Sequence, residues 1–156
     1  MIRKATLQDT AVICRLLEQV LAVHHAGRPD LFRASGTKYD ARDLEIIIQD
    51  PHTPVFVYED GSGVCGYVMC QEHSAEGRAL MPVKTLYIDD LCIDEKQRGK
   101  GIGQQLLEFA TAYARVNGFH NITLHAWESN PAAMAFYKKM GFQPQYTCLE
   151  KVVHSS

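Results

Sequence analysis

A glycine-rich loop between a strand pattern and a helix pattern constrains this chain more than any other feature. The run 87–93 is mostly apolar and predicts a strand, and three glycines follow within 99–103 after a short charged turn. Apolar residues then recur through 102–114 at the spacing of a buried helix face. Glycine lets a backbone approach a ligand, and the first N–H groups of a helix have no intrahelical partner. The stretch therefore predicts a phosphate-binding site at a helix N-terminus.

The spacing of the glycines decides which kind of phosphate loop this is. No glycine here has the Gly-Lys-Ser/Thr sequence that a nucleotide-hydrolysing P-loop needs. The dinucleotide fingerprint also fails, because Gln104 or Leu106 stands where its third glycine belongs. What remains is Arg98-x-x-Gly101-x-Gly103 after a strand. An ordinary tight strand-to-helix turn is the alternative interpretation.

Length, composition and charge limit the class of protein. With 156 residues, of which 46% are hydrophobic and 22% charged, the chain is expected to form one domain over residues 1–156. A net charge of -2 gives no reason to expect nucleic acid or an anionic membrane as a partner. No apolar run approaches the roughly 20 residues that span a bilayer. Residues 1–6 lack the apolar core of a signal peptide, so a cytoplasmic location is expected.

The cysteines indicate neither disulfides nor a metal site. Their number is odd, their spacings follow no zinc pattern and each lies in an apolar segment. We expect reduced, buried thiols and no bound metal. The five positions are Cys14, Cys65, Cys70, Cys92 and Cys148.

The order of elements predicts an α/β (α+β) fold in three layers. Helices are expected around 12–21, from residue 40 or 41 to 50, over 102–114 and from 130 to 141. Strands are expected at 2–5, 54–59, 64–70, 82–93, 121–127 and 145–153, with a hairpin around the turn 60–63.

The run 130–142 is a second motif, Asn-x-x-Ala-x-x-Phe-Tyr-x-x-x-Gly-Phe. Together with the glycine loop it resembles the two central motifs of the GNAT superfamily of N-acetyltransferases, in the order and separation typical of that family. The resemblance covers residues 88–142. It implies a single-domain fold with a mixed, mostly antiparallel central sheet that is flanked by helices and splayed at the central strand 86–93.

The resemblance also implies acetyl-CoA as the acetyl donor, without a metal. Pantetheine would pair with the backbone of the strand, and pyrophosphate would lie on the N–H groups of the loop. Asn130 would contact the lower pantetheine, although N-capping alone also explains an asparagine there. The residues implied are Leu91, Cys92, Ile93, Arg98, Gly99, Lys100, Gly101, Ile102, Gly103, Asn130 and Tyr137.

Acetyl transfer from a thioester to an amine has two proton requirements. The amine, with a pKa near about 10.4, must lose a proton, and the departing thiolate leaves better when it gains one. Tyr137 matches the family tyrosine that protonates the thiolate. A core position beside Phe136 is the alternative role for this side chain. The backbone N–H of Leu91 is the expected oxyanion donor.

The general base is less well defined by sequence. Asp89 lies where the family often has Glu, and Asp90 follows it. Because successive strand residues point to opposite faces, only one of the two is expected to face the substrate. His125 is a rival base, since imidazole titrates near neutrality. Each of these side chains also has an ordinary structural role as an alternative.

The acceptor is an amine of unknown identity. His24 and His25 lie between the early helices, where the family builds its acceptor wall, and a solvated loop is the alternative. Arg28, Asp30, Phe32 and Tyr39 are expected to join them. A small amine, an antibiotic amine, an amino acid or a peptide N-terminus would fit, and the Asp89–Asp90 pair favours a cationic acceptor.

We expect direct attack on acetyl-CoA in a ternary complex. The alternative function is an acyl-CoA-binding sensor or interaction module with little catalysis, although a pure binder does not need Tyr137. Dimerisation is common in the family, so a homodimer is also an expectation.

Overall fold

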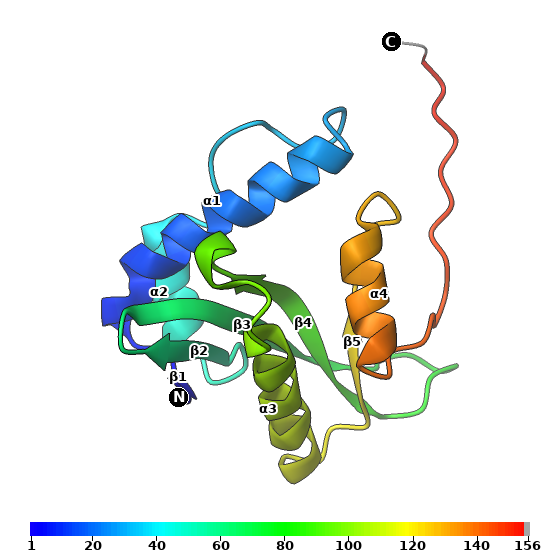
Figure 1. Cartoon of the computed structure of the whole chain (residues 1–156). Helices are drawn as coiled ribbons and strands as arrows, with labels where there is room; N and C mark the ends of the chain where they lie inside the picture. Colours follow the sequence, from blue (N-terminus) through cyan, green and yellow to red (C-terminus); the bar gives the residue numbers. More distant parts are fainter. Residues whose placement is uncertain (155–156) are drawn as a thin grey trace. The chain divides into compact units, whose positions relative to one another are not determined.

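The computed structural model describes residues 1–154, which contain a five-stranded mixed sheet with the order β1-β2-β3-β4-β5 (Figure 1). Neighbouring strands from β1 to β4 are antiparallel, whereas β5 joins β4 in parallel. The strands are β1 (Ile2–Lys4), β2 (Val55–Asp60), β3 (Gly63–Ser74), β4 (Lys84–Ile93) and β5 (Asn121–Leu124). This mixed, mostly antiparallel sheet, together with its flanking helices, confirms the predicted α/β (α+β) fold class.

The chain divides into two compact units, Met1–His125 and Ala126–Ser156, and each is described by itself. The first unit holds the sheet with three α-helices, α1 (Thr10–Gly27), α2 (Ala41–Gln49) and α3 (Ile102–Val116). Two short 3-10 turns, Leu7–Asp9 and Glu95–Gln97, precede α1 and the glycine loop. The second unit holds α4 (Pro131–Lys139). A single domain over 1–156 stays a prediction.

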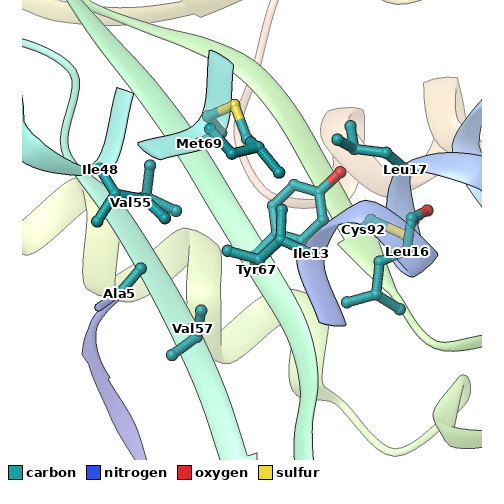
Figure 2. Packing of buried hydrophobic residues seen from close by; sticks show 11 residues of the cluster. Ala5, Ile13, Leu16, Leu17, Ile48, Val55, Val57, Tyr67, Met69 and Cys92 are labelled. Carbon is teal, nitrogen blue, oxygen red and sulfur yellow. Dashed lines mark hydrogen bonds between the residues drawn. The ribbon is translucent and has the colours of Figure 1, made fainter. Parts of the chain in front are cut away.

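Helices α1 and α2 cover one face of the sheet. Ile13 and Leu16 of α1 are fully buried against Tyr67 of β3 and Val57 of β2 (Figure 2). Leu44 of α2 joins the same cluster. Burial of such side chains contributes about 1.5–3 kcal/mol each, so this layer contributes strongly to the stability of the first unit.

Helix α3 covers the opposite face. Phe56 of β2 makes edge-to-face contacts with Phe109 and Tyr113 of α3, with ring centroids 4.9 and 5.2 Å apart. A Cβ added to Gly66 of β3 would lie 3.3 Å from the side chain of Leu106, so the helix packs closely on the strand. The first unit therefore has the three layers that the sequence predicts.

Strand β4 has a partner on both sides for only part of its length. Its pairing with β5 extends from Thr85 to Ile88, whereas β3 pairs with it as far as Ile93. Residues 89–93 therefore have a strand neighbour on one side only, which is the predicted splay. The β3–β4 register shifts between Met69 and Cys70, so that Asp89 is the extra residue of a β-bulge.

The second unit begins at a well-capped helix. Asn130 Oδ1 accepts a hydrogen bond from the Ala133 N–H at 3.2 Å, and Pro131 occupies the first turn. Gly141 ends the helix with a φ of 93°. The strand predicted at 145–153 is wrong, because the structure assigns no strand to these residues.

Candidate functional site

The glycine loop has the backbone geometry of an anion cradle. Gly99 and Gly101 have φ angles of 81° and 77°, which L-residues rarely adopt, and Gly101 is the N-cap of α3. Apart from the glycine itself and its two chain neighbours, no residue has a heavy atom within 4 Å of the place where a Cβ would stand on Gly99 or Gly101. The N–H groups of the first turn of α3, from Ile102 onward, have no partner within the helix. An anionic group can therefore approach this backbone closely.

Two cationic side chains lie beside the loop. Arg98 Nε donates to the Ile93 carbonyl at 3.2 Å, which ties the loop to the end of β4. Lys100 Nζ donates to Gln97 Oε1 at 2.7 Å. Both side chains belong to exposed residues, so their charge adds to the positive end of the α3 dipole.

The three predicted backbone contacts, Leu91, Cys92 and Ile93, all lie in the splayed part of β4. The side chain of Cys92 is buried toward α1, where its Sγ donates to the Leu16 carbonyl at 3.4 Å. The three residues keep β3 as a strand partner on one side. The edge that would face β5 has no strand partner among residues 1–154, which suits it to an extended ligand.

Asp89 accepts hydrogen bonds from two side chains that precede α2. Lys38 Nζ lies 2.6 Å from Asp89 Oδ1, and the Tyr39 hydroxyl donates to Oδ2 at 2.7 Å. Lys38 and Tyr39 also line a shallow, open pocket with Asp43, Ile46 and Ile47. Asp89 is thus an ion-paired carboxylate next to a surface depression.

Asp90 has a different environment. Its Oδ2 accepts a hydrogen bond from the buried Tyr67 hydroxyl at 2.8 Å. Burial raises the pKa of Asp90 to about 6, against the lowering effects of the Tyr67 hydrogen bond and the Lys38 charge. A carboxylate with this pKa is mostly ionised at neutral pH and accepts a proton more readily than an exposed one.

The expectation that only one of the two carboxylates faces the substrate rested on strict strand alternation, and it stays a prediction. The β-bulge at Asp89 interrupts the alternation, and Lys38 acts on both carboxylates. Sequence reasoning missed Lys38 and Tyr67. Their partners lie 51 and 23 residues away in the chain, and no spacing rule connects them.

The predicted acceptor wall forms a local cluster at the end of α1. The His24 ring stacks on Phe32 with centroids 4.8 Å apart, and His25 Nδ1 lies 2.8 Å from the Phe32 carbonyl oxygen. Arg28 and Asp30 form an ion pair at 2.7 Å. Burial, with a smaller contribution from the Lys38 charge, lowers the pKa of His24. The charge of Lys38, the ion-pair partner of Asp89, thus also acts on His24.

His125 lies beside β4 rather than in that group. The Tyr87 hydroxyl lies 3.3 Å from His125 Nδ1, and the two rings meet edge to face at 5.2 Å. His73 stacks on the same tyrosine with centroids 5.1 Å apart. This three-ring stack accounts for His125 structurally, and its role as a base stays a prediction.

In the second unit, Tyr137 is half-buried on α4. Its ring lies between Phe136 and Phe142, with centroids 5.3 and 5.7 Å away. The Phe142 N–H donates to the Tyr137 carbonyl at 3.0 Å, so the turn after α4 helps to fix the ring. Asn130 acts as the N-cap of the same helix, one of the two roles that the sequence left open, and its contact with pantetheine stays a prediction.

The cysteine prediction is correct for three positions and wrong for two. All five thiols are free, and Cys65, Cys70 and Cys92 are buried, but Cys14 is only partly buried and Cys148 is exposed. Burial raises the pKa of both Cys70 and Cys92 to about 12, so neither is a thiolate at neutral pH. Residues 1–154 contain no cluster of three metal-ligating side chains. Over the same residues, no helix is both long and apolar enough to cross a bilayer.

Comparison with known proteins identifies the family. The sequence model of the acetyltransferase (GNAT) family matches residues 20–142. The chain therefore belongs to this family.

Relatives of known sequence agree with that assignment. The chain is 28% identical to N-acetyltransferase 8F1 of Rattus norvegicus over 141 residues, which are 85% of this chain and 59% of the relative. It is 42% identical to the peptidyl-lysine N-acetyltransferase YjaB of Salmonella typhimurium over 57 residues, 36% of each protein. It spans 23% of the uncharacterised N-acetyltransferase YobR of Bacillus subtilis. These relatives are thus longer than the part that the chain matches.

Solved structures are also similar. A single-site mutant of the BH1408 protein of Bacillus halodurans has a TM-score of 0.94 and 29% identity over 99% of both chains. A glucosamine-6-phosphate N-acetyltransferase of Arabidopsis thaliana, at 19% identity and a TM-score of 0.72 over 99% of this chain and 98% of that one, has the same fold.

Proposed function

We propose that this chain is an acetyl-CoA-dependent N-acetyltransferase that acts on a primary amine. The observation that carries the proposal is the open cradle at Gly99–Gly101 after a strand whose residues 89–93 are splayed, in a chain of the GNAT family. Acetyl-CoA supplies the activated acetyl group. The residues Arg98–Gly103 would hold its pyrophosphate, and the backbone of Leu91–Ile93 would pair with its pantetheine.

A glycine substitution tests the cradle. Gly101→Ala is expected to weaken acetyl-CoA binding by about tenfold, because a Cβ occupies the open space and the φ of 77° costs about 1–2 kcal/mol for an L-residue. Gly118→Ala is the matched control, since Gly118 follows the other end of α3 with a φ of 75° and equally open surroundings. Isothermal titration with acetyl-CoA measures both. Equal affinity in the two variants would contradict the placement of pyrophosphate.

For the general base we propose Asp90 rather than Asp89. Asp89 is engaged by the Lys38 ammonium and the Tyr39 hydroxyl, which hold its side chain in place. The hydrogen-bond partners of Asp90, the Tyr67 hydroxyl and the backbone of Leu91, are neutral, and its pKa lies near the range useful for proton transfer. Asp89 and Lys38 would then help to position the amine acceptor.

For the general acid we propose Tyr137. A phenol with a pKa of about 10 donates to a thiolate whose conjugate acid has a pKa of about 8.5 when the two are held close together. The oxyanion of the tetrahedral intermediate would accept a hydrogen bond from the Leu91 N–H.

Direct attack by the amine, without an acetylated enzyme, is part of the proposal. Burial holds the pKa of Cys70 and Cys92 at about 12, so these thiols are poor nucleophiles. Burial also raises the pKa of Cys14 and Cys65. Only Cys148 is exposed, and it lies beyond the family match.

The class of amine that accepts the acetyl group has to be identified by experiment. Lys38 already neutralises Asp89, so the acidic pair supports a cationic acceptor less than the sequence suggested. Release of free CoA thiol from acetyl-CoA, measured with panels of amines, amino acids, aminoglycosides and lysine peptides, would identify it. Release that depends on one acceptor class supports the proposal. Tight binding of acetyl-CoA without release in any panel favours the sensor alternative.

A further inference from the structure

The Lys38 ammonium covers a nearly buried carboxylate. The side chain of Asp89 is 6% exposed, whereas that of Lys38 is 50% exposed. Each oxygen of Asp89 already has a donor, since Oδ1 lies 2.6 Å from the ammonium and Oδ2 accepts from the Tyr39 hydroxyl at 2.7 Å. Solvent beside this pair therefore meets the ammonium rather than the carboxylate. Another cation would have to displace Lys38 in order to pair closely with Asp89.

The local structure keeps Lys38 in this position. Asp40 begins α2 with a capping box, in which its Oδ1 accepts from the Asp43 N–H at 2.8 Å and its own N–H donates to Asp43 Oδ2 at 3.1 Å. Tyr39 packs against the buried cluster of the first unit. Lys38 Nζ lies 5.4 Å from the centre of the Tyr39 ring, within the range of a cation–π contact. The ammonium is thus held from both sides, by the carboxylate and by the ring.

The charge of Lys38 also acts beyond Asp89. Burial is the larger cause of the raised pKa of Asp90 and of the lowered pKa of His24, and the Lys38 charge lowers the pKa of both groups. Lys38 lines the shallow surface pocket as well. One cation therefore influences the proposed base and a residue of the expected acceptor wall.

We propose that Lys38 is a specificity-determining residue that disfavours acceptors with two positive charges, such as aliphatic diamines, and admits amines with one. Two carboxylates, Asp89 and Asp90, and one ammonium sum to one formal negative charge. A single substrate ammonium matches that charge, whereas the second ammonium of a diamine would meet Lys38 and be repelled. This role rests on the proposed acetyl transfer, because it narrows the acceptor class of that same site.

Binding of two matched amines tests the role of Lys38. Putrescine is a dication and butylamine is a monocation with the same carbon chain, and chemical-shift titration at low ionic strength measures the affinity for each. Lys38→Gln is expected to raise the affinity for putrescine relative to butylamine by about tenfold or more, because it uncovers Asp89 and removes the repelling charge. Lys38→Arg should restore the wild-type ratio, because it keeps the positive charge.

Lys4→Gln is the matched control, since it removes an exposed lysine from β1 and should leave the affinity ratio unchanged. A wild type that already prefers putrescine would overturn the proposal. So would Lys38→Gln with an unchanged ratio or with no detectable binding of putrescine. These affinities need no turnover, so their outcome is distinct from an absence of acetyl transfer, which would contradict the proposed function instead.

Discussion

Tyr137→Phe is expected to lower kcat by about 10²- to 10⁴-fold while leaving acetyl-CoA affinity unchanged, because general acid catalysis contributes about that much. The substitution removes only the hydroxyl. The ring contacts with Phe136 and Phe142 persist, so α4 keeps its packing. Steady-state rates with a saturating acceptor, together with isothermal titration of acetyl-CoA, separate the two effects.

Tyr58→Phe is a control for the loss of a tyrosine hydroxyl elsewhere, since Tyr58 lies on β2 and has no proposed role. The variant should retain the wild-type rate. An unchanged kcat in Tyr137→Phe would exclude Tyr137 as the general acid.

Asp90→Asn is expected to lower kcat/KM by about 10²-fold or more and also to stabilise the protein at neutral pH. Burial raises the pKa of Asp90 to about 6 from 3.8, so the folded state binds this proton more tightly than the unfolded state. The stabilisation from this protonation is complete below 3.8 and is lost as pH rises through about 6. At pH 7 the wild type therefore keeps an ionised, desolvated carboxylate at a cost on the order of 1–3 kcal/mol.

Asparagine removes that cost and still accepts the Tyr67 hydrogen bond. Urea unfolding at pH 7 is expected to show a higher free energy of unfolding for Asp90→Asn, and the difference should shrink as pH falls below about 6. A variant that is both less active and less stable at pH 7 would contradict this assignment of Asp90.

The pH dependence of kcat/KM tests the same residue. An amine acceptor contributes one ionisation, and Asp90 adds a second below about 6, so the logarithmic slope should steepen there. Asp90→Asn should lose the steeper limb. Tyr67→Phe should move it to higher pH, because the Tyr67 hydrogen bond lowers the pKa of Asp90.

Local sequence signals predicted most elements well. Asn130 and Pro131 marked the start of α4, and the hairpin turn at 60–63 joined β2 to β3. These signals act within a few residues of the chain, where capping and turn chemistry decide the backbone. The glycine loop is another such local signal, because Gly101 adopts the left-handed φ and is also the N-cap of α3.

Contacts between distant segments escaped sequence reasoning. The β-bulge at Asp89 depends on the register of two strands, and it brought both carboxylates within reach of Lys38. Tyr67 is a buried aromatic residue whose hydroxyl partner cannot be read from its own segment. The segment 145–153 has strand composition, yet the structure assigns no strand to it, because propensity alone does not decide β-structure.

The stoichiometry of acetyl transfer is the most direct test of whether this chain moves an acetyl group from acetyl-CoA straight to an amine. The chain would be mixed with acetyl-CoA and an accepted amine, and free CoA thiol, N-acetyl product and the intact mass of the protein would be measured by mass spectrometry. We expect one N-acetyl product for each CoA released, with no acetyl group on the protein at any time. An acetylated chain that precedes product would contradict direct transfer, and CoA release without N-acetyl product would contradict the proposed function itself.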